Sequence, residues 1–187
     1  LVEDRQLSVA KSIFERLDLE GITTELLWLR EANDFQANRL STALIARAGE
    51  VGGLPTVREV LISSKASPRR DALLAFTVSP NEPDVLWLLE EERLSEKMAS
   101  ALLLGVLRRA DDKAFVGLFS HRTIGERMVA RLSGDAVDIL SRAALLDNLP
   151  INTYIRVIQS VIPKVDDSRK FEIAHRAMGR CLRNRFD

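Results

Sequence analysis

The sequence predicts an all-α fold: an array of about ten antiparallel helices joined by short connectors. Three observations support it. Apolar residues recur at helical spacing almost throughout, prolines and glycines separate the periodic segments, and one residue pattern occurs twice. The composition agrees, because Leu, Ala, Arg and Glu dominate while aromatic residues make up only 5% of the 187 residues. Unbranched side chains lose little rotamer freedom in a helix.

Apolar stripes mark the predicted helices in chain order. Residues 101–107 are apolar on nearly every side, which predicts an inner helix covered by its neighbours. Residues 73–78 could form a strand, but a single strand would have no partner, so we expect helix there. The stripes are Leu7, Ala10, Ile13, Phe14 and Leu17; Phe35, Leu40, Ala43, Leu44 and Ala48; Val57, Val60 and Leu61; Leu102, Gly105 and Val106; Val137, Leu140 and Ala144; Ile151, Tyr154, Ile155, Ile158 and Ile162; Phe171, Ala174, Met178 and Cys181.

Residues between the stripes fit helix ends. All six prolines lie where a helix should begin or has just ended. Ser67 followed by Pro68 predicts an N-cap and the first helical residue, and Asp111 predicts another N-terminal cap. The pair Gly52 and Gly53 predicts a helix stop or a loop.

Two segments, 22–50 and 83–109, have similar patterns and contain the two tryptophans. Each predicts one helix ending in charged residues, a short break, and a second helix richer in small and apolar residues. We interpret them as a duplicated helix hairpin. A shift of 59 residues (87 − 28) matches 27–29 with 86–88, and after one deletion 40–45 matches 98–103.

Stacked hairpins of this kind resemble the α-solenoid class, which includes HEAT-like and tetratricopeptide-like arrays, in architecture only. The tetratricopeptide spacing of Trp, Gly, Tyr and Pro is absent. The resemblance implies a curved array in which each hairpin buries one face on the next. We therefore expect Trp28 and Trp87 to be equivalent core positions, with a third, poorer copy near Leu145 and Leu146. We expect residues 1–187 to form one helical-repeat domain of a larger protein, because the chain does not open with Met.

The sequence assembles no catalytic or metal site. Cys181 and His175 are six residues apart on one predicted helix and point to different sides. Two histidines and one cysteine are too few for the usual zinc sites. Asp84, Asp111 and Lys113 match a loose metal-dependent nuclease pattern, but the residues between them predict helices and the acids predict helix caps, so we reject it. We expect no enzyme, no cofactor and no metal.

Charge and targeting signals exclude some classes of partner. The 27 Lys and Arg balance 27 Asp and Glu, so the chain has no general attraction to nucleic acid or anionic lipid. No signal peptide is evident, and the longest apolar run is far shorter than the roughly 20 residues that span a bilayer. A single cysteine gives no internal disulfide. We expect a cytoplasmic location and no membrane contact.

The residues from Lys164 to Asp187 are basic, with seven Lys and Arg against four Asp and Glu. Arg176, Arg180 and Arg183 share a helix face opposite the last apolar stripe, and Arg169 precedes them. Two interpretations stay open: a solvated outer face, or a docking strip for an acidic partner.

We expect a non-catalytic scaffold or adaptor that binds another protein or another domain of its parent chain. One alternative is binding of the nucleic-acid backbone through the arginine face, without base stacking because no aromatic residues interleave. Another is a helical regulatory or linker domain of a larger enzyme. The oligomeric state stays open.

Overall fold

A computed structural model confirms the all-α prediction in the residues that it describes, 2–31, 35–141 and 144–183. Twelve α-helices and two short 3-10 helices occur there, somewhat more than the ten or so predicted. In this part of the chain, none of the helices is long and apolar enough to cross a membrane. The contacts group the residues into two compact units, Leu1–Thr77 and Val78–Asp187.

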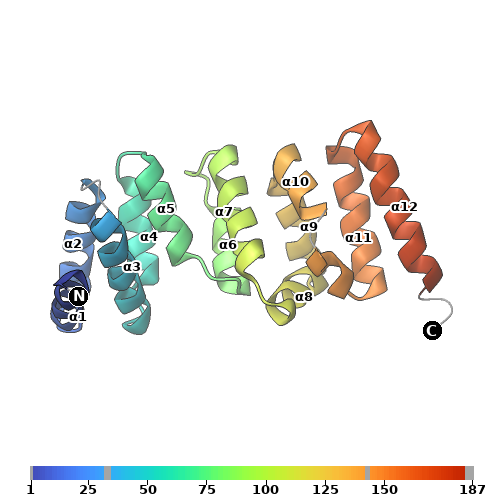
Figure 1. The fold of residues 1–187 in the computed structure, drawn as a ribbon. Coiled ribbons are helices and arrows are strands. Elements are labelled where there is room, and N and C mark those ends of the chain that lie inside the picture. The colour runs from blue at the N-terminus through green and yellow to red at the C-terminus, as the bar shows by residue number, and fades with distance from the viewer. Residues whose placement is uncertain (1, 32–34, 142–143, 184–187) are drawn as a thin grey trace. The chain divides into compact units, whose positions relative to one another are not determined.

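Unit 1 is built around its third helix, which packs against the other four helices of the unit. Its helices are α1 (Val2–Phe14), α2 (Leu19–Glu31), α3 (Phe35–Glu50), α4 (Leu54–Ser63) and α5 (Pro68–Thr77) (Figure 1). Helix α5 includes most of the segment 73–78 that the sequence left between strand and helix. The largest fully buried side chains of the unit are Ile22, Leu26, Leu44, Leu61 and Leu74, and Phe14 is also buried.

The turn between α3 and α4 closes α3 with paired backbone hydrogen bonds. The N–H of Gly53 donates to the carbonyl of Ala48 (2.7 Å), and the N–H of Gly52 donates to that of Gly49 (3.1 Å). This pattern needs a left-handed residue, and Gly52 has φ of 71°. A Cβ on Gly53 would lie 2.3 Å from Cδ1 of Leu19. The predicted glycine stop is thereby confirmed.

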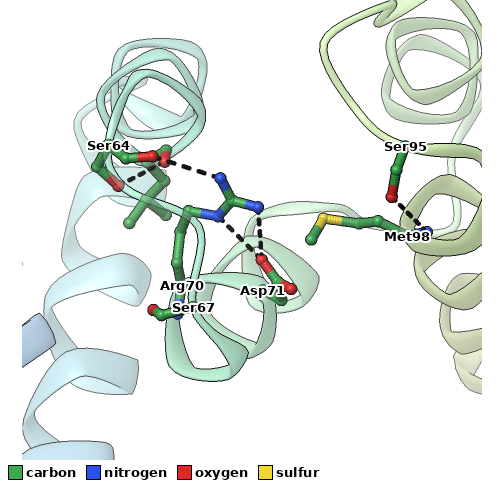
Figure 2. Close-up of polar contacts among 7 residues, drawn as sticks. Ser64, Ser67, Arg70, Asp71, Ser95 and Met98 are labelled. Atoms are coloured by element: carbon green, nitrogen blue, oxygen red, sulfur yellow. Dashed lines mark hydrogen bonds and ion pairs between the residues drawn. The ribbon is translucent and has the colours of Figure 1, made fainter.

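The start of α5 confirms the predicted cap. Pro68 is the first helical residue, and Oγ of Ser67 accepts a hydrogen bond from the N–H of Arg70 (3.1 Å). The Arg70 guanidinium also pairs with Asp71 (2.7 Å) and donates to the Ser64 carbonyl (3.4 Å) (Figure 2). These contacts join the first turn of α5 to the end of α4.

A buried arginine satisfies the other end of α5. Arg58, on α4, is 5% exposed, and its Nε and Nη2 both donate to the carbonyl of Thr77. Helix ends leave such carbonyls without helical partners, so the guanidinium replaces the donors that the next turn would supply.

Unit 2 contains seven α-helices and both 3-10 helices in its described residues. They are α6 (Glu82–Glu90), α7 (Glu96–Arg109), α8 (Asp112–Ser120), α9 (Arg122–Arg131), α10 (Gly134–Ser141), η1 (Ala144–Asn148), α11 (Ile151–Val161), η2 (Ile162–Lys164) and α12 (Asp167–Arg183). Helix α7 contacts α6, α9 and α10, which confirms the expected inner helix, although Ala101 is exposed. Oγ of Ser95 accepts from the N–H of Met98 (3.3 Å) and caps α7 (Figure 2).

The two aspartates of the rejected nuclease pattern accept backbone hydrogen bonds at helix N-termini. The Asp111 carboxylate accepts from the N–H of Ala114 (2.7 Å), as an N-cap of α8. Asp84 lies in the first turn of α6, where its carboxylate accepts from the N–H of Ser79 (2.7 Å). The N-cap of α6 is Asn81, which accepts from the N–H of Asp84 (2.9 Å).

The expectation that both tryptophans are core residues is wrong. Trp28 is 69% exposed and Trp87 is half-buried. Each side chain points about 130° away from the centre of the buried stripe of its helix at 100° per residue. The two positions are thus similar in orientation, but neither lies in the core. The buried residues are Ile22, Leu26 and Leu29 on α2, and Val85 and Leu88 on α6.

Some residues of the predicted stripes cannot be assigned. The side chains of Leu7, Phe35, Ala144 and Leu145 lie outside the described residues, as do residues 184–187. Ile13, predicted to be buried, is 56% exposed on α1.

Candidate functional site

Helix α12 carries all four arginines that the sequence singled out, but the helix is turned opposite to the expectation. Its one buried residue is Ile173, and the helix packs against α11 (Figure 1). The stripe expected to be buried is largely outside, with Phe171 76% exposed and Met178 59% exposed. The expected burial of this stripe is therefore wrong.

Arg180 explains the orientation, because its guanidinium meets acceptors on its own chain. Its Nη1 donates to the carbonyl of Leu146 (2.6 Å), and its Nη2 donates to that of Leu149. Its Cζ lies 4.2 Å from the centre of the Tyr154 ring on α11, within reach of a cation–π interaction. Two carbonyls at a helix break thus obtain donors that the backbone does not supply there.

The neighbouring arginines also bind within the chain. Arg176 pairs with Asp147 (2.6 Å), and Arg180 lies 3.9 Å from the same carboxylate. Arg169 pairs with Glu172, one turn further along α12. The structure thus brings Arg176 and Arg180 together at η1.

Arg183 differs from the other three candidates because its side chain is exposed near the end of α12. The contacts of the arginine face at Tyr154 and Asp147 escaped the sequence analysis. One feature of the sequence could have indicated these contacts. The helix break before Pro150 leaves backbone carbonyls that require hydrogen-bond donors.

Burial changes the titration of the Tyr154 phenol more than the neighbouring charges do. Burial raises the pKa of Tyr154 above its usual value, the Arg176 charge works against this, and Asp147 adds to it. Arg180 also lowers this pKa, but less than burial raises it. A guanidinium over the ring face is the arrangement that a cation–π contact requires.

The outward side of α12 presents three large apolar side chains, which we call the apolar α12 face: Phe171, Met178 and Leu182. Leu182 is 57% exposed, so all three exceed half exposure. Their spacing of i, i+7 and i+11 places them on one stripe about 16 Å long. His175 lies between them, and its ring stacks on Phe171 with centroids 6.4 Å apart. Such a stripe is suited to burial against another helix.

Each unit also has an open groove. In unit 1, a groove of about 540 Å³ lies between α1 and α3 and includes the Arg47–Glu50 ion pair (2.9 Å). In unit 2, a groove of about 700 Å³ is lined by residues such as Glu96, Arg131 and Lys164. Within the described residues, no group of three or more His, Cys, Asp or Glu could hold a metal ion.

The ammonium of Lys164 caps the C-terminal end of α9. Its Nζ donates to the carbonyls of Val129 (2.7 Å), Ala130 (2.6 Å) and Leu132 (2.9 Å) at the end of α9. Burial lowers the pKa of Lys164, and Glu96 partly offsets this. These contacts give Lys164 a structural role in the groove.

Comparison of the chain with protein-family models, curated proteins and solved structures gave no match. The function therefore has to be argued from the surface of the chain.

Proposed function

We propose that this chain is a non-catalytic protein-interaction module that binds a helix of another protein, or of another domain of its parent chain, on the apolar α12 face. The observation that supports this best is the exposure of Phe171, Met178 and Leu182 on one stripe. The opposite face of the same helix is bound to its own chain through Arg176 and Arg180.

The exposed stripe is a source of binding free energy. Fully burying one large apolar side chain contributes about 1.5–3 kcal/mol. Single exposed apolar residues are ordinary on a protein surface, but three in line along one helix form a continuous patch. Large exposed apolar patches are typical of interaction sites, which supports the proposal.

The shape of the stripe favours a helix as the partner. An amphipathic helix presents apolar anchors at i, i+3, i+4 and i+7, which can follow a stripe of this length. Glu172 and Arg183, both exposed, lie on one flank of the stripe and provide the polar rim that protein interfaces usually have.

The inward contacts keep this surface in place. The Arg180 guanidinium is held by two carbonyls and the Tyr154 ring, and Ile173 is buried beside them. A face fixed before binding loses less conformational entropy when the partner docks. The arginines thus contribute to binding indirectly, by holding the helix.

The proposal is tested with the intact chain as an affinity bait beside three variants. Phe171→Asp and Met178→Asp place a charge on the apolar α12 face, and Phe76→Asp is the matched control because Phe76 is 51% exposed on α5. We expect a partner that binds the parent and Phe76→Asp but is lost with both α12 variants.

The partner is then titrated calorimetrically against the same proteins. We expect binding to map to a helical segment of the partner and to weaken at least roughly tenfold with Phe171→Asp, because an apolar anchor is lost. Equal binding to the parent and the α12 variants contradicts the proposal.

A further inference from the structure

We propose that the apolar α12 face binds the same face of a second copy of this chain, with the two helices antiparallel. This rests on the proposed function and names the partner for that site. Charge and side-chain size on the two flanks of the stripe support this pairing.

The apolar α12 face is complementary to itself when one of the two helices is reversed. Phe171 and Leu182 are separated by three helical turns, so reversal about the point between Arg176 and Ala177 places Phe171 opposite Leu182 of the second copy. The same reversal places Met178 opposite His175 of the second copy. Every apolar side chain of the face, at 76%, 59% and 57% exposure, then meets a facing side chain. The two-fold relation makes each contact occur twice.

The charges on one flank have the same property. Glu172 and Arg183 have the same separation along the chain as Phe171 and Leu182, so they lie on one flank of the apolar α12 face. The Glu172 side chain is 65% exposed, and Arg183 is exposed. In an antiparallel two-fold pair equal flanks face each other, and the register that sets Phe171 opposite Leu182 leaves Glu172 about 3 Å along the axis from Arg183 of the second copy. Both side chains are long enough to span that offset, with Glu172 shared between Arg169 of its own helix and Arg183 of the second copy. Opposite charges facing across an interface fix its orientation.

The other flank allows the helices to approach closely. It carries Ala174, Ala177 and Cys181, which are small and half-buried, and Lys170 at its N-terminal end, whose ammonium pairs with Asp167 (2.7 Å). A parallel pair would bring opposite flanks together, so that Glu172 would face Lys170, which already pairs with Asp167, and Arg183 would face Ala177 and Cys181 of the second copy in place of a carboxylate. Antiparallel helices also align their dipoles favourably.

The association should be modest. One pair of facing helices buries less surface than the roughly 1,600 Å² of a standard interface, so we expect a dissociation constant in the micromolar range. Sedimentation equilibrium of the intact chain over roughly 1–500 μM covers that range.

A charge exchange tests the orientation. Glu172→Arg and Arg183→Glu each place like charges opposite one another twice, and each should weaken the dimer roughly tenfold. The double variant Glu172→Arg/Arg183→Glu restores opposite charges and should return to within about threefold of the parent. The matched control is Glu126→Arg, which breaks an exposed ion pair with Arg122 on α9 and should leave association unchanged.

Circular dichroism should match the parent for each variant, which shows that the variants fold. Met178→Asp provides a second route: because Met178 is exposed, this variant should fold and remain monomeric. A parent that is monomeric throughout the range, or a double variant as weak as the singles, overturns the dimer.

The two proposals fail separately. A monomeric parent that loses a heterologous helix through Phe171→Asp contradicts the dimer and leaves the proposed function standing. A monomeric parent for which Phe171→Asp changes no binding contradicts both.

Discussion

Arg180 and Arg183 are less than one turn apart on α12, yet their side chains have different surroundings. Arg180 is bound to two carbonyls and the Tyr154 ring, with its side chain 16% exposed, whereas Arg183 is exposed. We expect Arg180→Ala to lower the free energy of unfolding by about 2–3 kcal/mol, because the carbonyls lose charged donors and the ring loses its cation.

Urea unfolding measures this difference. Arg183→Ala is the matched control and should stay within about 0.5 kcal/mol of the parent. Equal effects of the two variants would contradict the inward placement of Arg180.

The burial of Tyr154 predicts that stability depends on pH at alkaline values. The ionisation of this phenol can be followed directly, since it is the chain's one tyrosine. Burial raises its pKa in the folded chain above the ordinary value of about 10. The unfolded chain therefore releases the phenolic proton first. The stability linked to Tyr154 is fully present below pH of about 10 and is lost as the pH rises through the raised pKa.

Absorbance at alkaline pH reports the ionisation directly, and unfolding of Tyr154→Phe isolates the contribution from that of the lysines. We expect the parent to lose stability more steeply than Tyr154→Phe as the pH rises above about 10. Phenol ionisation in the folded chain at or below its ordinary pKa would contradict the burial.

At the scale of single elements, helix periodicity was readable from the sequence but helix orientation was not. The stripes identified helical segments, and Ser67, Asp111 and Gly52 marked ends that the structure confirms. Each of these signals acts within a few residues, so no tertiary information was needed. Trp28 shows the limit, since the repeated hairpin pattern predicted a core position, whereas the core side of α2 is formed by Ile22, Leu26 and Leu29.

The prediction of which side of helix α12 is buried was wrong for a related reason. An apolar stripe normally faces inward, but the carbonyls of Leu146 and Leu149 need donors, and Arg180 provides them. That requirement arises from a segment about thirty residues earlier, which spacing within α12 cannot reveal. The outward position of Phe171 and the inward position of Arg180 follow together from one rotation of the helix.

The predicted duplication is consistent with burial in the second helix of each hairpin, without being established by it. Positions 44, 45 and 48 on α3 are buried, and so are 102, 103 and 106 on α7. Leu/Ala-rich helices share such patterns by chance, so the repeat stays a prediction.

The α3–α4 turn gives a test at the same scale. Gly52 has φ of 71°, and a Cβ at this position would meet nothing within 4 Å. Gly52→Ala should therefore destabilise through backbone conformation alone, by about 1–2 kcal/mol. Gly52→Asn should lose less, because Asn tolerates the left-handed region.

Gly105→Ala is the matched control for this turn. Gly105 lies within α7, and a Cβ there would also meet nothing within 4 Å, so the substitution should stabilise by about 0.5–1 kcal/mol. Thermal unfolding of all three variants checks the sign of each change. A stabilising Gly52→Ala would be incompatible with the turn described.

For the whole molecule, the curved array predicted from the sequence stays a prediction, while the charge balance bears on the class of partner. The formal net charge is zero, and Arg169, Arg176 and Arg180 are bound within the chain. We expect gel-shift titrations with duplex DNA and single-stranded RNA to show no salt-sensitive binding even at low salt. Binding that weakens steeply with salt and is lost in Arg183→Ala would restore the nucleic-acid alternative.

The central claim is that α12 turns its apolar face outward and its arginine face inward. Cysteine labelling tests it directly, using Phe171→Cys, Met178→Cys and Ile173→Cys, each in a Cys181→Ser background. At a protein concentration below the micromolar range, where the chain is monomeric, we predict rapid labelling at 171 and 178 and labelling slower by at least roughly tenfold at 173, where opening of the helix is required. Rapid labelling at 173 with protection at 171 and 178 would contradict the account and return the arginines to the surface.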